Sequence, residues 1–327
     1  MAFAQLPVEL IDAICQRGQP TDLVALSRTC SSIYPVAQRH LYRHLSISTA
    51  SRNLRAVVTL ARRPELAQNV RTFSLRAECA TVFRPFLRLV GMALSRMTEL
   101  VSLDLFVDPD ASWILSEARC TYTRLSRFSC SLVFDSHVVE FLGKTEALLE
   151  LQVDGASISH NALPVPALPA RSIPHLSQFV GSSHVACAIV PGRPVESIHL
   201  PLGDLTAEDV TVLANSTSHV LIFGATATSS PLPILESLSQ HMSSLIYLRL
   251  MTTFDFLEVP QPSFYERIAK ALSSLADLEG FELGGLHWVN AQKNLQDQQP
   301  VWQSQPFAGE IIGAEDLDLD SDLFYVY

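Results

Sequence analysis

Leu245-Ile-Tyr-Leu-Arg-Leu250 is the clearest copy of an apolar hexad, spaced L-x-x-L-x-L, that recurs between residues 46 and 290. Because 48% of the chain is hydrophobic, about one start in nine would match this spacing by chance, so a single copy means little. The regular recurrence of the hexad is the stronger evidence. Three further clear copies occupy residues 100–105, 148–153 and 278–283, and weaker copies start at Val70, Leu125, Leu176, Val195 and Val220.

Successive hexads start 19 to 33 residues apart, and amphipathic segments lie between many of them. These segments have apolar residues at helical spacing and occupy residues 86–94, 136–142, 206–213, 233–238 and 265–272. Thr206 followed by Asp209 is a start signal for one of these helices. Strand and helix thus alternate, and this alternation predicts an α/β fold whose strands are parallel.

The first 45 residues have a different pattern, that of three short helices. Pro7 and Pro20 suit the first turns of two of them, because a proline lacks only an N–H that is unpaired there. The third helix is expected from about residue 36 to residue 45. The apolar residues at helical spacing are Leu6, Leu10, Ile11 and Ile14 in the first helix, and Leu23 and Leu26 in the second. Because a module of this size can bury only a small core, we expect another protein to cover its apolar surface.

The order of residues in this module also matches a known family. Leu6-Pro7, Glu9-Leu10, Ile14, Asp22-Leu23 and Cys30 follow one another at the spacing of an F-box, and His40-Leu-Tyr-Arg-His44 is similar to the form common in fungal F-box proteins. The resemblance implies that the helices dock on the Skp-type adaptor of a cullin–RING ubiquitin ligase. The contact residues that we expect are Leu6, Pro7, Leu10, Ile11, Ile14, Leu23 and Leu26. Many F-boxes have a Trp shortly after the position of Cys30, where this chain has Ile33-Tyr34.

The hexads resemble leucine-rich repeats, whose period is typically 20 to 29 residues. In that family the last two apolar positions of the hexad point inward, and the residues between and after them line a concave face. The candidate substrate-binding residues on this face are Ser102, Asp104, Gln152, Glu196, His199, Tyr247, Arg249 and Glu282. The family's asparagine or cysteine three residues after the hexad is missing and is replaced by residues such as Asp108, His184 and Gly203. We therefore expect an irregular solenoid.

The chain thus divides into three predicted parts: an F-box-like helical module at 1–45, a leucine-rich-repeat-like domain at 46–291, and a Gln-rich segment with an acidic tail at 292–327. Four prolines between residues 162 and 174 indicate an exposed loop between two repeats. After Glu310 the tail has acidic residues and no basic ones. It is either a short docking strand or a disordered acidic motif.

Composition narrows the function classes. The net charge is −10, yet the first 63 residues hold eight Arg against three acidic residues. These Arg are scattered around several helices without a nucleic-acid-binding motif, so we expect no nucleic-acid partner. We also expect no secretory signal and no membrane segment. Six cysteines without paired spacing indicate reduced thiols and a cytoplasmic or nuclear protein.

No nucleophile elbow or phosphate-binding loop occurs in the sequence. His40 and His44 have the i, i+4 spacing of zinc ligands, but the residues between them are Leu-Tyr-Arg, with no Glu for a general base. We therefore expect neither catalysis, a cofactor nor a metal. The sequence favours a substrate-recruiting adaptor of an SCF-type ligase, with an unknown protein substrate on the repeats. One alternative is an interaction scaffold in which the N-terminal helices only cap the repeats. Another is an unrecognised hydrolase with Ser, His and an acid brought together in a pocket.

Overall fold

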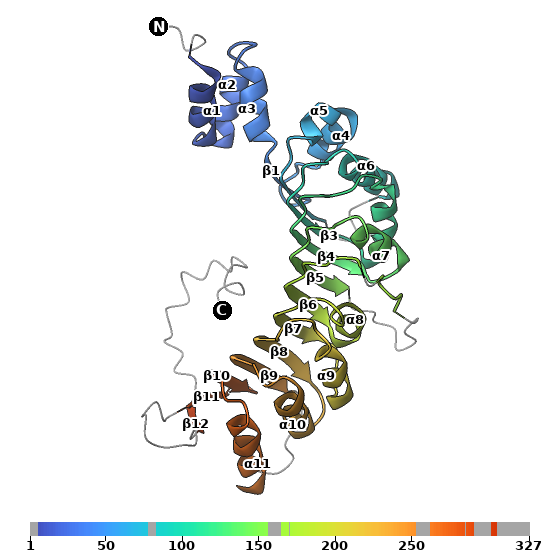
Figure 1. Ribbon diagram of the computed structural model, residues 1–327. Coiled ribbons are helices and arrows are strands. Elements are labelled where there is room, and N and C mark those ends of the chain that lie inside the picture. Colours follow the sequence, from blue (N-terminus) through green and yellow to red (C-terminus); the bar gives the residue numbers. More distant parts are fainter. Residues whose placement is uncertain are drawn as a thin grey trace.

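The computed structural model describes residues 6–77, 83–155, 165–169, 171–252, 262–284, 286–290 and 302–305. A three-helix module stands at one end of an elongated solenoid (Figure 1). The module consists of α1 (Val8–Gln16), α2 (Pro20–Ser27) and α3 (Tyr34–Leu41). Buried residues of all three helices form a small core that is separate from the solenoid core: Ile11, Cys15, Leu23, Ile33, Val36 and Ala37.

The solenoid is built on one sheet in which the strands follow chain order. Strands β1 to β10 are parallel, whereas β11 and β12 are antiparallel to their neighbours. The strands are β1 (His44–Ser48), β2 (Thr72–Arg76), β3 (Ser102–Phe106), β4 (Arg127–Val133), β5 (Glu150–Gly155), β6 (Gln178–Ser182), β7 (Ser197–Leu202), β8 (Ile222–Ala227), β9 (Tyr247–Thr252), β10 (Gly280–Leu283), β11 (Leu286–Asn290) and β12 (Trp302–Gln305). The predicted α/β class with parallel strands is confirmed.

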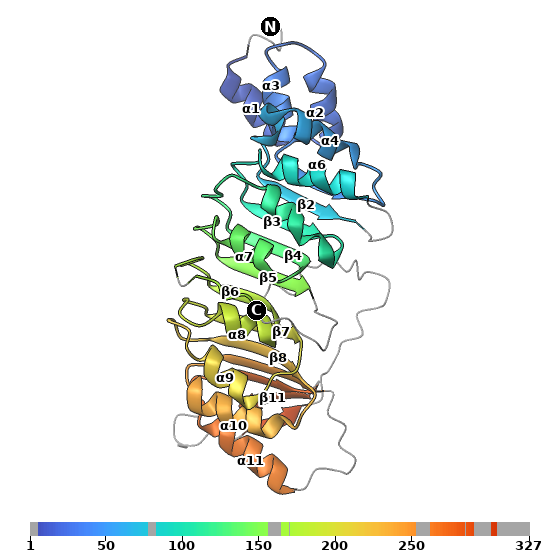
Figure 2. The same cartoon turned by 90° about the vertical axis from the view of Figure 1, so that its right-hand side faces the viewer.

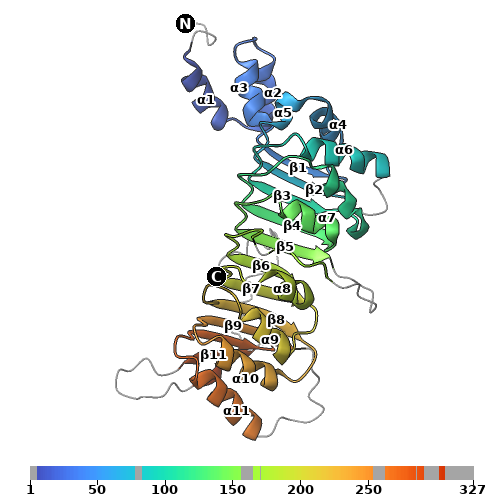
Figure 3. The same ribbon diagram turned by 45° about the vertical axis from the view of Figure 1, so that its right-hand side comes forward.

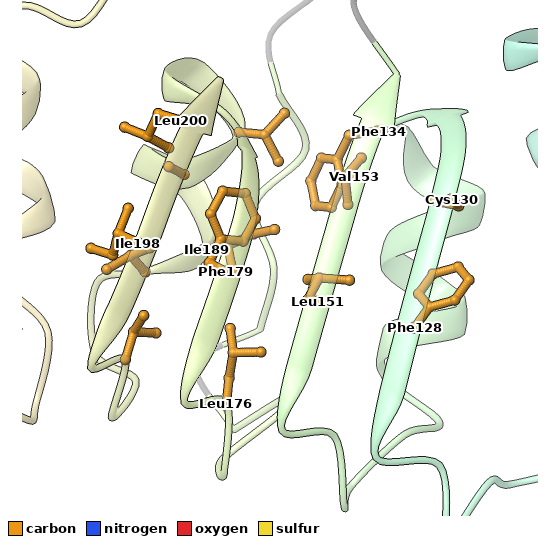
Figure 4. Packing of buried hydrophobic residues seen from close by; sticks show 14 of the residues in the cluster. Phe128, Cys130, Phe134, Leu151, Val153, Leu176, Phe179, Ile189, Ile198 and Leu200 are labelled. Atoms are coloured by element: carbon orange, nitrogen blue, oxygen red, sulfur yellow. The ribbon is translucent and has the colours of Figure 1, made fainter. Parts of the chain in front are cut away.

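Each predicted hexad begins two residues before a strand, so all nine hexads produce β2 to β10. The fourth hexad position forms a continuous buried row, in which Phe128, Leu151, Phe179 and Ile198 are register neighbours at 0–1% exposure. Figure 4 shows these side chains on the same side of β4 to β7. The apolar spacing therefore selects the strand face that packs beneath the helices.

Helices cover one face of this sheet (Figure 2), and within the described part of the chain no helix packs on the opposite face (Figure 1). They are α4 (Arg55–Arg62), α5 (Pro64–Ala67), α6 (Arg84–Leu94), α7 (Ser136–Leu142), α8 (Ser183–Ile189), α9 (Ala207–Leu213), α10 (Pro231–His241) and α11 (Pro262–Ser273), with a 3-10 helix at Pro109–Glu117. The five predicted helices overlap α6, α7, α9, α10 and α11. Thr206 and Asp209 form the expected capping box: the Thr206 hydroxyl accepts from Asp209 N, and Asp209 Oδ2 accepts from Thr206 N.

Backbone carbonyls hold neighbouring repeats in register. The residue at the second hexad position accepts hydrogen bonds from two consecutive N–H groups of the next repeat: Leu221 O accepts from Ile246 N at 2.8 Å and from Tyr247 N at 3.1 Å. The same arrangement recurs from Arg43 to Ile246 at nine carbonyls: Arg43, Arg71, Val101, Ser126, Leu149, Ser177, Glu196, Leu221 and Ile246. These carbonyls, each of which accepts two hydrogen bonds, align the strand starts without an asparagine ladder. The predicted irregularity does appear later along the strands, as register shifts between β4 and β5 and between β6 and β7.

The structure differs from the sequence prediction at both ends of the repeats. The third helix ends at Leu41, and Tyr42, Leu45 and Ile47 pack into the solenoid core through β1. At the other end β11 and β12 extend the sheet, and Trp288 and Trp302 join the same core. The acidic tail after Glu310 lies outside the described residues.

A side chain covers the free edge of β1. The Asn53 amide donates from Nδ2 to Ser46 O at 2.8 Å and accepts at Oδ1 from Ser48 N at 3.0 Å. It thereby imitates a peptide group of a further strand, which protects an edge that could pair with another chain. Among the described helices, none has the length and apolar character needed to cross a bilayer.

Candidate docking and recognition surfaces

Helix α1 has one buried and one exposed apolar side. Ile11 and Cys15 are buried in the module core, whereas Val8, Leu10 and Ile14 are 54%, 51% and 42% exposed. Exposed apolar residues gathered on one short helix indicate a protein-binding surface. Leu10 and Ile14 lie one helical turn apart on the same side of α1, and we call this pair the α1 face; exposed Val8 lies on another side, beyond buried Ile11 and Cys15.

The predicted docking residues do not all lie on this face. Pro7, Leu10 and Ile14 are exposed, Leu6 and Leu26 are partly buried, and Ile11 and Leu23 are buried within the module. The sequence analysis did not select Val8, which lies between Leu6 and Leu10 and outside their helical spacing. Tyr34, the aromatic residue near the expected Trp position, is 40% exposed at the start of α3.

An ionic contact between helices holds α1 in place. Asp12 Oδ1 lies 2.5 Å from Arg39 Nη2 and 2.6 Å from His40 Nε2, so it joins α1 to α3. The hydrogen bonds from His40 and Arg39 lower the pKa of Asp12. Since Asp12 projects from the side of α1 opposite Leu10 and Ile14, this contact ties α1 to α3 and leaves these two residues outward.

The face of the sheet opposite the helices presents a row of residues at the fifth hexad position. Register pairs place them side by side in the order Ser46, Ser74, Asp104, Ser129, Gln152, Val180, His199, Gly224, Arg249 and Glu282. We call this set the concave row. Figure 3 shows how the strands that carry it stack along the molecule.

Five of the eight predicted concave residues belong to this row: Asp104, Gln152, His199, Arg249 and Glu282. Ser102 and Tyr247 lie two residues earlier on their strands and on the same face, although Ser102 is only 7% exposed. Glu196 lies one residue before β7, where its carbonyl accepts from Leu221 N and Ile222 N. The structure therefore brings seven of the eight to one face.

Two carboxylates characterise the N-terminal half of this face. Burial raises the pKa of Asp104, while the charges of Arg127 and Arg76 partly oppose the shift. Burial also raises the pKa of Asp154, opposed by a hydrogen bond from Gln152 Nε2 to Asp154 Oδ2 of 2.8 Å. Both carboxylates thus lie in a less polar environment than water.

The C-terminal half contains a connected polar cluster. The Tyr247 hydroxyl donates to Glu282 Oε1 at 2.6 Å, and Arg249 Nε lies 3.1 Å from Glu282 Oε2. On β7, Ser197 Oγ and His199 Nε2 are 3.1 Å apart. Burial, and then the positive charge of Arg249, lower the pKa of His199.

The Ser197–His199 pair bears on the hydrolase alternative. A serine triad needs an acid that binds the second ring nitrogen of the histidine. Here His199 Nδ1 faces Gly224, and in the described part of the chain no carboxylate is hydrogen-bonded to it. The pair therefore does not reproduce a triad.

Comparison with protein families adds one finding. The family described as F-box-like matches residues 3–48, which include the three helices and β1. A sequence comparison with curated proteins gives no match. The α1 face lies inside the matched segment, and the concave row lies almost wholly beyond it. The chain therefore has an F-box-like domain at its N-terminus, as expected of an adaptor-type protein.

Proposed function

We propose that this protein is a substrate-recruiting adaptor of an SCF-type ubiquitin ligase. Its α1 face would bind the Skp-type subunit, and its concave row would bind a protein substrate. The observation that carries this proposal is the F-box-like match over a module whose own core leaves Val8, Leu10 and Ile14 exposed. A separate solenoid, on whose second sheet face no described helix packs, would supply the second surface that an adaptor needs.

Leu10→Asp tests the docking surface. An aspartate in the centre of an apolar interface is expected to weaken binding of the Skp-type subunit by at least about 30-fold, since a hot-spot residue contributes roughly 2 kcal/mol or more. Leu10 is half exposed, so the module should still fold. Binding of the purified full-length chain to the Skp-type subunit is measured by calorimetry.

Leu149→Asp is the matched control, because Leu149 is 44% exposed but lies in the solenoid, one residue before β5. It should bind like the unaltered chain. Leu23→Asp would not be informative, since Leu23 is buried and its loss would unfold the module. Unchanged affinity in Leu10→Asp and in Ile14→Asp would rule out docking through the α1 face.

A non-ligase scaffold remains a second candidate, favoured by the position of the module at one end of the repeat array. In that role the three helices would protect the first repeat and no Skp-type subunit would bind. The separate core of the module argues for docking, because a cap would be expected to share its core with the repeat that it covers.

A further inference from the structure

The C-terminal half of the concave face holds a guanidinium group that is fixed on one side only. Arg249 Nε faces Glu282 Oε2, and Glu282 Oε1 accepts from Tyr247, so both carboxylate oxygens have partners. The Glu282 side chain is 18% exposed, whereas that of Arg249 is 45% exposed. Within the described ranges, the Nη atoms of Arg249 form no hydrogen bond. This leaves a positioned guanidinium with its outer edge open.

The sheet beside Arg249 has no side chain. His199, Gly224 and Arg249 are register neighbours on β7, β8 and β9. A Cβ at Gly224 would lie 3.0 Å from His199 Nδ1 and 4.0 Å from Arg249 Cβ. The His199 ring therefore lies against the place that a side chain at Gly224 would take, and between His199 and Arg249 this row of the sheet has only backbone.

The charge of this part of the sheet is favourable for an anion. Strands β6 to β9 contain no Asp or Glu, and Arg249 is their only fully charged residue. Glu282, on β10, is already paired with Tyr247 and Arg249. The field of Arg249 reaches His199, whose pKa it lowers. An anion between them would pair with the guanidinium and favour protonation of the imidazole.

We propose that His199, Gly224 and Arg249 form a site for an acidic side chain of a protein partner. The oxygens of a carboxylate or phosphoryl group would take the open edge of the Arg249 guanidinium, a planar fork that suits two parallel hydrogen bonds. Tyr247 and Glu282 act as positioning residues, since Glu282 holds the guanidinium and Tyr247 holds Glu282. The inference rests on the proposed function and names the chemistry of the segment that the adaptor recruits.

The test observes the His199 ring by NMR in the full-length chain, labelled with ¹³C-histidine and assigned with His199→Gln. The probes are blocked peptides Ala-Asp-Ala, Ala-phosphoserine-Ala and Ala-Lys-Ala at millimolar concentration. The two acidic peptides are expected to shift the His199 signal with saturation, and the lysine peptide is not. The acidic peptide with the lower Kd identifies carboxylate or phosphoryl as the preferred group.

Arg249→Gln is expected to abolish the shift, and Arg249→Lys, which keeps the charge but loses the fork, to weaken binding by about tenfold. Arg127→Gln removes another exposed concave arginine, on β4, and should change nothing. The proposal is overturned by equal shifts from all peptides, by no shift from either acidic peptide, or by a shift that survives Arg249→Gln. Skp-type binding does not involve Arg249, so intact adaptor binding with any of these results would reject the anion site alone.

Discussion

At the scale of the residue, the protein has thiols whose pKa values are shifted in opposite directions. The Ser32 hydroxyl and the Ile33 backbone N–H lower the pKa of Cys30 just before α3. Burial raises the pKa of Cys130 to about 12 inside β4. Cys187 is partly exposed, yet burial and the nearby Asp209 carboxylate raise its pKa to about 12 as well.

These thiols should therefore react with iodoacetamide in a defined order, because the thiolate is the nucleophile. At about pH 8, Cys30 should be alkylated first and Cys130 last. Cys187 should be slow despite its exposure, and its rate should still rise with pH after that of Cys30 has levelled off. Peptide mass spectrometry measures the rates, with the denatured chain as the control. Rapid alkylation of Cys130 in the folded chain would contradict this order.

Single residues also show where sequence reasoning stops. The hexad spacing predicts which leucines are buried, because alternation in a strand leaves only two faces. In α1 the apolar stripe covers a wide arc, so the same spacing includes buried Ile11 and exposed Leu10. Which edge of the stripe packs on the module and which stays free depends on the placement of α3, which the sequence does not show.

At the scale of the element, β1 depends on Asn53. In Asn53→Ala, Ser46 O and Ser48 N lose their partners, and loss of two hydrogen bonds should lower the free energy of unfolding by about 1–3 kcal/mol. The exposed edge should also promote self-association. Urea unfolding and light scattering measure the two effects.

Asn53→Asp separates these effects. It keeps the acceptor for Ser48 N, loses the donor for Ser46 O, and adds a charge that opposes strand pairing. This variant should be less stable but monomeric. Asn69→Ala, which removes an exposed bond to Glu65 O in a turn, should show neither change. A stable, monomeric Asn53→Ala would show that the edge needs no cover.

The missed strand β1 had a signal in the sequence. Tyr42, Leu45 and Ile47 have the L-x-x-L-x-L spacing, with an aromatic in the first position. The prediction of a third helix to residue 45 includes Tyr42 and Leu45 because the apolar residues after Val36 also fit a helical face. Helical spacing over so short a segment does not separate the two structures, and only pairing with β2 decides between them.

At the scale of the whole molecule, two cores define where the chain can be divided. Deletion of residues 1–41 removes the entire module core and leaves Tyr42, Leu45 and Ile47 in the solenoid. The solenoid should therefore keep its cooperative thermal transition within a few degrees. Deletion of residues 1–48 also removes β1 with buried Ile47, so it should lower the free energy of unfolding by at least about 2 kcal/mol.

Circular dichroism with temperature compares the two truncations. If the helices only cap the repeats, deletion of 1–41 should already unfold them. This comparison separates the scaffold from the adaptor, and it requires a cut before Tyr42. The predicted boundary at residue 45 would divide β1.

The order of the sheet could be predicted from the alternation of strands and helices. The antiparallel return of β11 and β12 could not, because the hexad period ends at β10 and the closure depends on Trp288 and Trp302 packing at the end of the core. The residues proposed to bind a substrate share a face for a simple reason: in parallel strands that start in register, equal positions are neighbours.

The nine carbonyls that each accept two hydrogen bonds at the strand starts have a consequence for how this protein could evolve. They belong to the main chain, so almost any amino acid at these positions preserves the alignment of the strands. A repeat could therefore gain or lose residues on its helical side, as the spacing of 19 to 33 residues already shows, without displacing any member of the concave row. Recognition surface and repeat length would then vary independently, and new cargo could be acquired by point substitution alone.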